Sequence, residues 1–254
     1  IATETQTFLN SFYDLLAERF FFIPKDKHRF EIKKEYISKA GFWVAKKRYA
    51  QWMILKNGIP CDKLDVKGLD VVRSSFPKAF QKFMSTMLKD ILMGKDNEYI
   101  DDTLLTFKKS LPTLPVNTIA KGGALKELSK YDNGSWKTGD AVANFEKGTP
   151  AHVKAGITYN RLLKFFNCPY KHEPIRDGDK VKWVYLKDNP LGLETVAFKD
   201  YNDPKEIMDF VETYVDRNKI FEAELENKLD DFYNALKWDK VTADTKTAKK
   251  FFAF

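Results

Sequence analysis

The stretch GFWVAKKRYA, residues 41–50, contains aromatic and β-branched side chains interrupted by basic ones. This composition predicts a strand over Phe42–Leu55. Lys56-Asn57-Gly58 follows at once and is typical of a hairpin turn, because Asn and Gly adopt positive φ at little cost. Alternating or β-rich patterns also predict strands over His28–Ile37 and Lys63–Val72. The four signals together indicate a small antiparallel sheet.

Apolar residues at helical spacing precede and follow this sheet. A helix is predicted over Glu4–Phe22, and another over Phe76–Leu92 with Ser75 as its N-cap. The remaining predicted elements are helices over Asp101–Leu111 and His152–Phe166, a tight turn at Arg176–Asp179, a strand over Lys180–Leu186, and one or two long helices after Asp203-Pro204. We therefore expect an α+β protein, with a small antiparallel sheet and a helix followed by a mainly helical part.

Composition excludes several classes of protein. The chain has 254 residues, of which 43% are hydrophobic and 15% aromatic, so a disordered polymer is excluded. The longest apolar cluster, Phe20–Ile23, is far too short to span a bilayer, and no membrane partner is expected. No signal peptide is visible. Cys61 and Cys168 are far apart in sequence, which suits a reducing, cytoplasmic compartment better than a secreted disulfide scaffold.

The positive charge is unevenly distributed. The net charge is +7, but residues 205–240 hold six basic and ten acidic side chains, a net charge of −4, which leaves +11 on the rest of the chain. A body this basic favours a polyanionic partner, most often nucleic acid. The alternative is that the excess of lysine only keeps the protein soluble.

The basic run at the centre of the first stretch is a candidate for DNA contact. In a strand, Lys46 and Arg48 share one face, and Lys47 and Tyr49 share the other. Either pair could reach phosphates or the acceptors of the minor groove, which differ little between sequences. The alternative is a solvated basic edge that discourages strand pairing.

Three further segments follow this motif along the chain: KGLDVVRSSFPK (67–78), AHVKAGITYNR (151–161) and DGDKVKWVYL (177–186). Taken in this order, the four segments resemble family B DNA polymerases, especially the replicative polymerases of large tailed bacteriophages. In that family a Lys-Lys-Arg-Tyr strand follows the last palm carboxylate motif, and a Lys-Gly-Leu-Asp strand leads into the thumb. The resemblance covers nearly the whole chain.

The resemblance implies an organisation and a set of DNA contacts. It makes residues 1–73 the end of the palm, residues 74–240 the thumb and residues 241–254 a flexible tail. Primer–template duplex would be bound by Lys46, Lys47, Arg48 and Tyr49 near the primer terminus, by Ser74, Ser75 and Lys78 at the start of the thumb, and by His152, Lys154, Tyr159 and Arg161 along the thumb. The alternative for His152 and Tyr159 is a packing role in the core.

The chain ends in Phe251-Phe252-Ala253-Phe254 after a basic linker. Exposed apolar clusters tend to be binding sites. These phenylalanines, Phe251, Phe252 and Phe254, resemble the aromatic peptide by which such polymerases dock on a sliding clamp. The alternative is a tail that folds back on the thumb.

The metal-binding motifs of the family are missing. Polymerase chemistry needs two Mg²⁺ ions, which the family holds on Asp-x-x-Ser-Leu-Tyr-Pro and Asp-Thr-Asp motifs, and neither occurs here. We therefore expect no catalytic residue, metal or cofactor in this chain and no DNA synthesis by it alone. The resemblance implies an N-terminal polymerase subunit carrying the exonuclease, the fingers and the catalytic palm, with Mg²⁺ in the assembled enzyme.

Other interpretations stay open at this point. The chain is either a naturally split subunit or a fragment of a polymerase in the cytoplasm of an infected bacterial host or an equivalent compartment. The rival functions are a non-catalytic accessory protein of replication that binds duplex DNA, and a basic RNA-binding protein.

Two motifs have simpler explanations. Tyr99-Ile100-Asp101-Asp102 matches a Tyr-x-Asp-Asp metal motif, but we expect Asp101 or Asp102 to cap a helix. Cys168 and His172 have a spacing seen in zinc sites, yet a structural zinc site needs four ligands and no others lie nearby in sequence.

Overall fold

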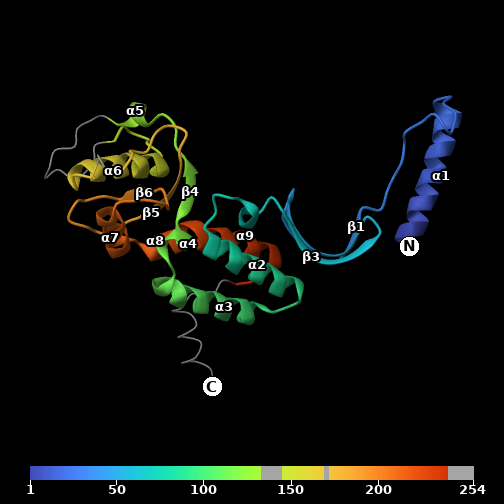
Figure 1. Cartoon of the computed structure of the whole chain (residues 1–254). Helices are drawn as coiled ribbons and strands as arrows, with labels where there is room; N and C mark the ends of the chain where they lie inside the picture. The colour runs from blue at the N-terminus through green and yellow to red at the C-terminus, as the bar shows by residue number, and fades with distance from the viewer. Residues whose placement is uncertain (133–144, 169–171, 240–254) are drawn as a thin grey trace, which may run out of the picture. The chain divides into compact units, whose positions relative to one another are not determined.

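The chain forms two compact units in a computed structural model that describes residues 1–132, 145–168 and 172–239 (Figure 1). The first unit is Ile1–Lys67 and the second is Gly68–Phe254. Each contains a three-stranded antiparallel sheet, and helices make up much of the second unit. The α+β class expected from the sequence is confirmed.

The first unit is a helix followed by a meander. Its elements are α1 (Ala2–Phe20), β1 (Tyr36–Ala45), β2 (Arg48–Lys56) and β3 (Ile59–Lys67), paired in the order β1-β2-β3. The predicted helix is confirmed, and the Asn57-Gly58 turn joins β2 to β3 with φ of +50° and +81°.

The single strand predicted over 42–55 is wrong. Ala45 pairs with Arg48, so Lys46 and Lys47 form a two-residue turn between β1 and β2, and Lys47 takes a φ of +64°. The third strand ends at Lys67, five residues earlier than predicted, because the chain enters a 3₁₀ turn at Asp70–Val72.

The strand predicted over 28–37 is also wrong, except at its end. Residues 28–35 run without a ladder partner, and side chains of α1 bind them instead. The Asn10 amide donates to the Ile32 carbonyl at 3.0 Å and accepts from the Ile32 N–H at 2.8 Å. The Gln6 side chain accepts from the Lys34 N–H at 2.9 Å. An amide offers the same donor and acceptor pair as a neighbouring strand, so it satisfies this backbone.

The second unit contains the remaining elements. In chain order these are η1 (Asp70–Val72), α2 (Lys78–Leu92), α3 (Asn97–Ser110), η2 (Leu111–Thr113), α4 (Val116–Ile119), β4 (Lys121–Ala124), α5 (Leu128–Tyr131), α6 (Ala151–Phe165), β5 (Lys180–Tyr185), β6 (Thr195–Phe198), α7 (Lys205–Tyr214), α8 (Arg217–Phe221), the π-helical turn η3 (Glu222–Glu226) and α9 (Asn227–Leu236). Its sheet has the order β4-β5-β6, and α6 packs against β6 (Figure 1). The helices and the strand predicted from residue 76 onward are confirmed with small shifts of their ends.

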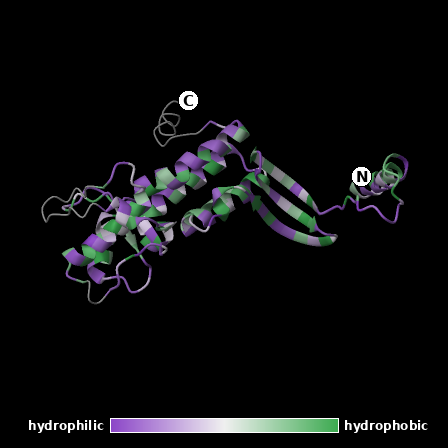
Figure 2. Ribbon diagram, turned by 90° about the horizontal axis from the view of Figure 1, so that it is seen from above, coloured by the Kyte–Doolittle hydropathy of each residue, from purple (hydrophilic) through white to green (hydrophobic). Residues whose placement is uncertain are grey.

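Aromatic rings form the core beside α2 and α3. The Phe80 ring meets the rings of Phe107 and Phe221 edge-on, with centres 5.8 and 6.4 Å away, and Phe83 stacks on Phe107 at 4.3 Å. Buried residues recur every three or four positions along α2, at Phe80, Phe83, Met84, Met87 and Leu88, and hydrophobic and hydrophilic residues alternate along the helical ribbons in Figure 2. Burial of this stripe explains why helical spacing predicted α2 well.

Both predicted helix caps are wrong. Pro77 is the N-cap of α2, and Ser75 lies in the turn before it. Asp96 caps α3 by accepting from the Tyr99 N–H at 2.9 Å, because the helix begins one turn earlier than predicted.

Asp101 is instead buried within α3 and accepts a hydrogen bond from the Tyr233 hydroxyl at 2.5 Å. Burial, and then this carboxylate, raise the pKa of Tyr233. Asp101 thus joins α3 to α9.

Replacing Asn10 with Ala tests the amide contact in the first unit. Loss of both hydrogen bonds should weaken local protection by about 1–2 kcal/mol, so the Ile32 amide should exchange with solvent roughly tenfold faster, whereas the Lys34 amide, which Gln6 holds, should change less. Native-state hydrogen exchange measures this. Thr7→Ala is the matched control, since the exposed Thr7 hydroxyl bonds only within α1. Equal exchange in both variants would contradict the account.

Candidate nucleic-acid interface

The first candidate surface is the β1–β2 turn. Lys46 and Lys47 are exposed at the turn, while Arg48 and Tyr49 are half-buried at the start of β2. The predicted alternation of these four residues on two strand faces does not hold, because a turn separates the lysines from β2. The turn brings both lysine side chains to one exposed end of the hairpin.

An exposed tryptophan adjoins this turn and was missed by the sequence analysis. Trp43 pairs with Tyr49 across β1 and β2, and 66% of its surface is exposed. A Cβ on Gly41 would overlap the Trp43 ring, so the glycine leaves room for the ring to lie along the strand. The signal was present in the sequence, since an aromatic residue beside a basic run is typical of nucleic-acid contact.

The second candidate surface joins three segments that are distant in sequence. The Gly122 N–H of β4 donates to the Ser75 carbonyl at 2.9 Å. A Cβ on Gly122 would lie 3.1 Å from the Ser75 Cα, and one on Gly123 would lie 3.4 Å from the His152 Cβ. The turn before α2, the strand β4 and the first turn of α6 are therefore in contact. Ser74, Ser75 and Lys78 are all exposed there.

Lys121 is a basic residue of this surface that the sequence analysis missed. Its ammonium lies 2.5 Å from a Glu224 carboxylate oxygen and 5.4 Å from the centre of the Trp183 ring. Glu224 is buried in η3 and also binds Lys228 at 3.0 Å. One carboxylate thus holds two cations, and the trio keeps a net positive charge. The Gly-Gly pair after Lys121 was the signal, because glycine inside a strand marks a close backbone approach.

His152 is half-buried beside this cluster. Burial lowers the pKa of His152, and the Lys121 charge lowers it further. Since its usual pKa is already below 7, the ring is neutral at neutral pH. His152 can therefore offer a hydrogen bond to a bound phosphate, but no charge.

Two residues predicted to line DNA are buried. Tyr159 is 1% exposed, and burial together with the Asp203 charge raises its pKa. Arg161 is 5% exposed and pairs with Asp132 at 2.6 Å. Both side chains are occupied within the fold, because Tyr159 lies beside Asp203 and the Arg161 guanidinium lies 5.0 Å from the centre of the Phe145 ring. Their burial supports a packing role, which the sequence left open for Tyr159, and their contact with DNA stays a prediction.

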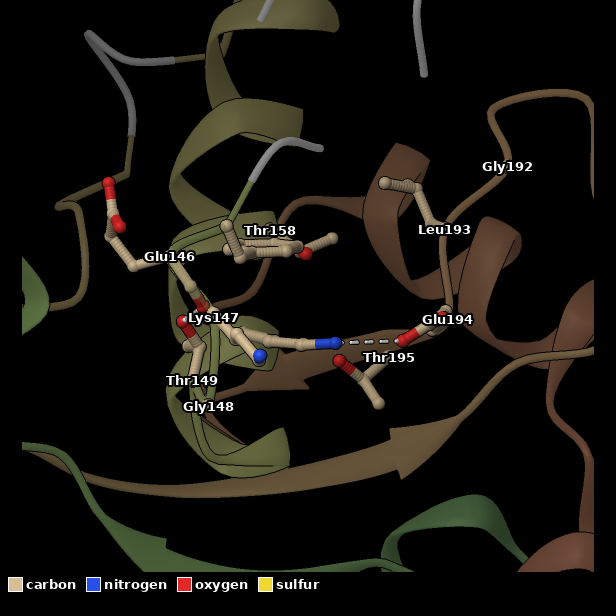
Figure 3. A pocket seen from close by; sticks show the side chains of 11 residues that line it. Glu146, Lys147, Gly148, Thr149, Thr158, Gly192, Leu193, Glu194 and Thr195 are labelled. Carbon is tan, nitrogen blue, oxygen red and sulfur yellow. Dashed lines mark hydrogen bonds and ion pairs between the residues drawn. The ribbon is translucent and has the colours of Figure 1, made fainter. Parts of the chain in front are cut away.

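Lys154 lies on a cavity rather than on the second surface. Its ammonium pairs with Glu194 at 3.1 Å across a cavity of about 430 Å³ (Figure 3). Three hydroxyl side chains, Thr149, Thr158 and Thr195, also line this space. The ion pair offsets the lysine charge, so Lys154 contributes less to an anion surface than the sequence alone suggested.

Metal-ligating residues are dispersed in the part of the chain that is described. No group of three or more His, Cys, Asp or Glu side chains is placed to hold a metal ion within 1–132, 145–168 and 172–239. The Cys168 thiol contacts the Phe166 carbonyl at 3.3 Å, and His172 Nδ1 lies 2.7 Å from the Asn202 carbonyl. The predicted clamp peptide, Phe251, Phe252 and Phe254, lies outside the described residues.

Comparison with known proteins identifies the family. The sequence profile of DNA polymerase family B matches residues 23–227. This chain belongs to DNA polymerase family B. It is 28% identical to the DNA-directed DNA polymerase of Enterobacteria phage T4 over 186 residues, which cover 72% of this chain and 19% of that protein. It is also 28% identical to the DNA-directed DNA polymerase of Escherichia phage RB69 over 204 residues, 78% of this chain and 21% of that protein.

This family B chain therefore spans about one-fifth of the length of the relatives that it matches. The resemblance to phage polymerases expected from the sequence is confirmed. Among the described residues of the chain, no helix is long and apolar enough to cross a membrane.

The double substitution Lys46→Gln/Lys47→Gln tests the first surface. Each lost phosphate contact should lower the slope of log affinity against log salt by about 1, so the pair should lower it by about 2. Fluorescence anisotropy with a primer–template duplex over a salt series measures the slope. Lys56→Gln, an exposed lysine at the far end of β2, is the matched control. An unchanged slope in the double variant would remove the turn from the interface.

Proposed function

We propose that this chain is the end of the palm and the thumb of a phage replicative DNA polymerase, and that it grips primer–template duplex. The observation that carries the proposal is the exposed Lys46-Lys47 turn inside a segment that matches DNA polymerase family B. In this proposal the first unit is the palm end and the second unit is the thumb.

The grip uses charge and backbone geometry. Lys46 and Lys47 neutralise phosphates, and Trp43 and Tyr49 next to them supply flat aromatic surfaces. On the second unit, Lys78 and Lys121 supply positive charge, and the exposed hydroxyls of Ser74 and Ser75 can donate to phosphate oxygens. Contacts to phosphates fix the position of a duplex without selecting its sequence. This property suits an enzyme that must copy any template.

The chemical step needs residues that the described part of the chain does not offer. The absence of a carboxylate cluster there means that these residues do not fit a pair of Mg²⁺ ions. We assign the Mg²⁺ site to the rest of the polymerase, where the ions would activate the primer hydroxyl and stabilise the leaving pyrophosphate. This part of the enzyme could be a separate subunit or a further portion of the same polypeptide.

Reconstitution of primer extension tests the function. The chain is mixed with a polypeptide that carries the Asp-Thr-Asp motif and the remainder of a family B polymerase. Extension should require both components, and Lys46→Gln/Lys47→Gln should shorten the products made in each binding event. Lys56→Gln should behave as the wild type. Extension that never depends on this chain would favour an accessory protein, and tighter binding to RNA than to DNA duplex would favour an RNA-binding protein.

The C-terminal phenylalanines are proposed to bind a sliding clamp. A clamp that encircles DNA raises the effective concentration of the duplex at the polymerase without any new DNA contact. Deleting residues 251–254 should abolish capture by the clamp and leave the affinity for bare primer–template unchanged. Capture assays with the purified clamp measure this, and undiminished capture would refute the assignment.

A further inference from the structure

Helix α1 turns polar side chains toward the rest of its unit, where most amphipathic helices turn apolar ones. Its polar side chains bind other parts of the same unit: Gln6 and Asn10 bind the backbone of residues 32–34, and the Asp14 carboxylate lies 3.0 Å from the His28 ring nitrogen. Gln6, Asn10 and Asp14 are spaced four residues apart, so they form one stripe along the helix. This polar stripe, together with Ala17 and the half-buried Tyr13, forms the inward face.

The opposite face of α1 is apolar and exposed. Phe8, Phe12 and Leu15 are 70%, 48% and 45% exposed. At about 100° per residue, this stripe lies roughly half a turn from the polar stripe. Phe20, Phe21 and Phe22 are also exposed where the helix ends, at 71%, 55% and 87%. Exposed apolar side chains gathered on one helix face mark an interaction site.

The first unit also has a small core. Of its 67 residues, only Ala17, Phe42, Ala50, Gln51 and Met53 are buried. A unit of this size depends on a well-filled core or on an external partner. Ala17 is the single buried residue of α1. The helix is therefore attached to the rest of the unit mainly through the hydrogen bonds of its polar stripe.

We propose that the stripe Phe8-Phe12-Leu15 is the docking surface for the polypeptide that carries the remainder of the family B polymerase. This inference rests on the proposed function. The match covers about one-fifth of each relative, so most of such a polymerase has no counterpart in this chain. The unit with few buried residues is also the unit whose helix exposes Phe8, Phe12 and Leu15, as expected if the remainder of the polymerase completes that core.

The charge of α1 argues against a lipid occupant. The helix carries Glu4, Asp14 and Glu18 but only one basic residue, Arg19. Helices that lie on membranes carry Lys and Arg on the polar face, because cellular surfaces are anionic. In α1 the only charged residue of the polar stripe is Asp14, which already pairs with Lys25 and His28. The apolar stripe therefore fits an apolar groove on a protein.

The triple substitution Phe8→Gln/Phe12→Gln/Leu15→Gln tests the docking surface. Glutamine keeps the helix propensity and removes the apolar area. The probe is the polypeptide with the Asp-Thr-Asp motif, and its affinity for this chain is measured by analytical ultracentrifugation. The affinity should fall about 100-fold or more. Ile59→Gln and Met93→Gln, at isolated exposed apolar residues, should leave it unchanged. Protection of the Ile32 and Lys34 amides from exchange should persist and report an intact α1.

The outcomes distinguish a failure of the docking surface from a failure of the proposed polymerase function. An unchanged affinity of the triple variant, or no binding of the probe by the wild-type chain, would overturn the docking surface. Self-association of the chain that the triple variant abolishes, with the probe still bound normally, would assign the stripe to a second copy and overturn it too. A wild-type complex that forms through the stripe but never extends a primer would refute the polymerase function and retain the docking surface.

Discussion

The hydrogen bond from the Gly122 N–H to the Ser75 carbonyl is the contact on which the candidate DNA surface of the second unit depends. It ties an edge strand of the sheet to the turn that starts α2. The approach is so close that only glycine fits without displacing the Ser75 backbone. This contact brings Lys121 next to the exposed serines, and the neighbouring glycine allows His152 to pack alongside. Without it, these residues would belong to three unrelated segments.

Much of the second unit could be predicted because its local patterns agree with its packing. The apolar side chains of α2 recur every three or four residues, and Phe80, Phe83 and Met87 are all buried. In β5 the apolar residues Val181 and Trp183 are buried and the lysines between them are more exposed, as their alternation predicts. The predicted turn at Arg176–Asp179 is closed by the Asp179 N–H, which donates to the Arg176 carbonyl. Secondary structure can be predicted from sequence where the local residue pattern agrees with the tertiary packing of the element.

The wrong predictions of secondary structure and exposure are mostly explained by contacts between residues that are far apart in sequence. Residues 28–35 have a strand-like pattern, but the side chains of Asn10 and Gln6 bind the backbone of Ile32 and Lys34. A side chain more than twenty residues away leaves no periodic signal in the sequence. The Lys46-Lys47 turn lacks the glycine or asparagine that usually marks a hairpin. The burial of Tyr159 and Arg161 could not be predicted from α6 alone, because their partners Asp203 and Asp132 are about thirty or more residues away in sequence.

The central claim is that both basic surfaces of this chain contact the same kind of ligand, primer–template duplex. Hydrogen exchange of the chain, measured with and without duplex at low salt, tests this most directly. The account predicts slower exchange in residues 43–49, 74–78 and 121–123, and no change in the acidic helices α7 and α9. Protection confined to α7 and α9, or none in the two basic surfaces at saturating DNA, would contradict it.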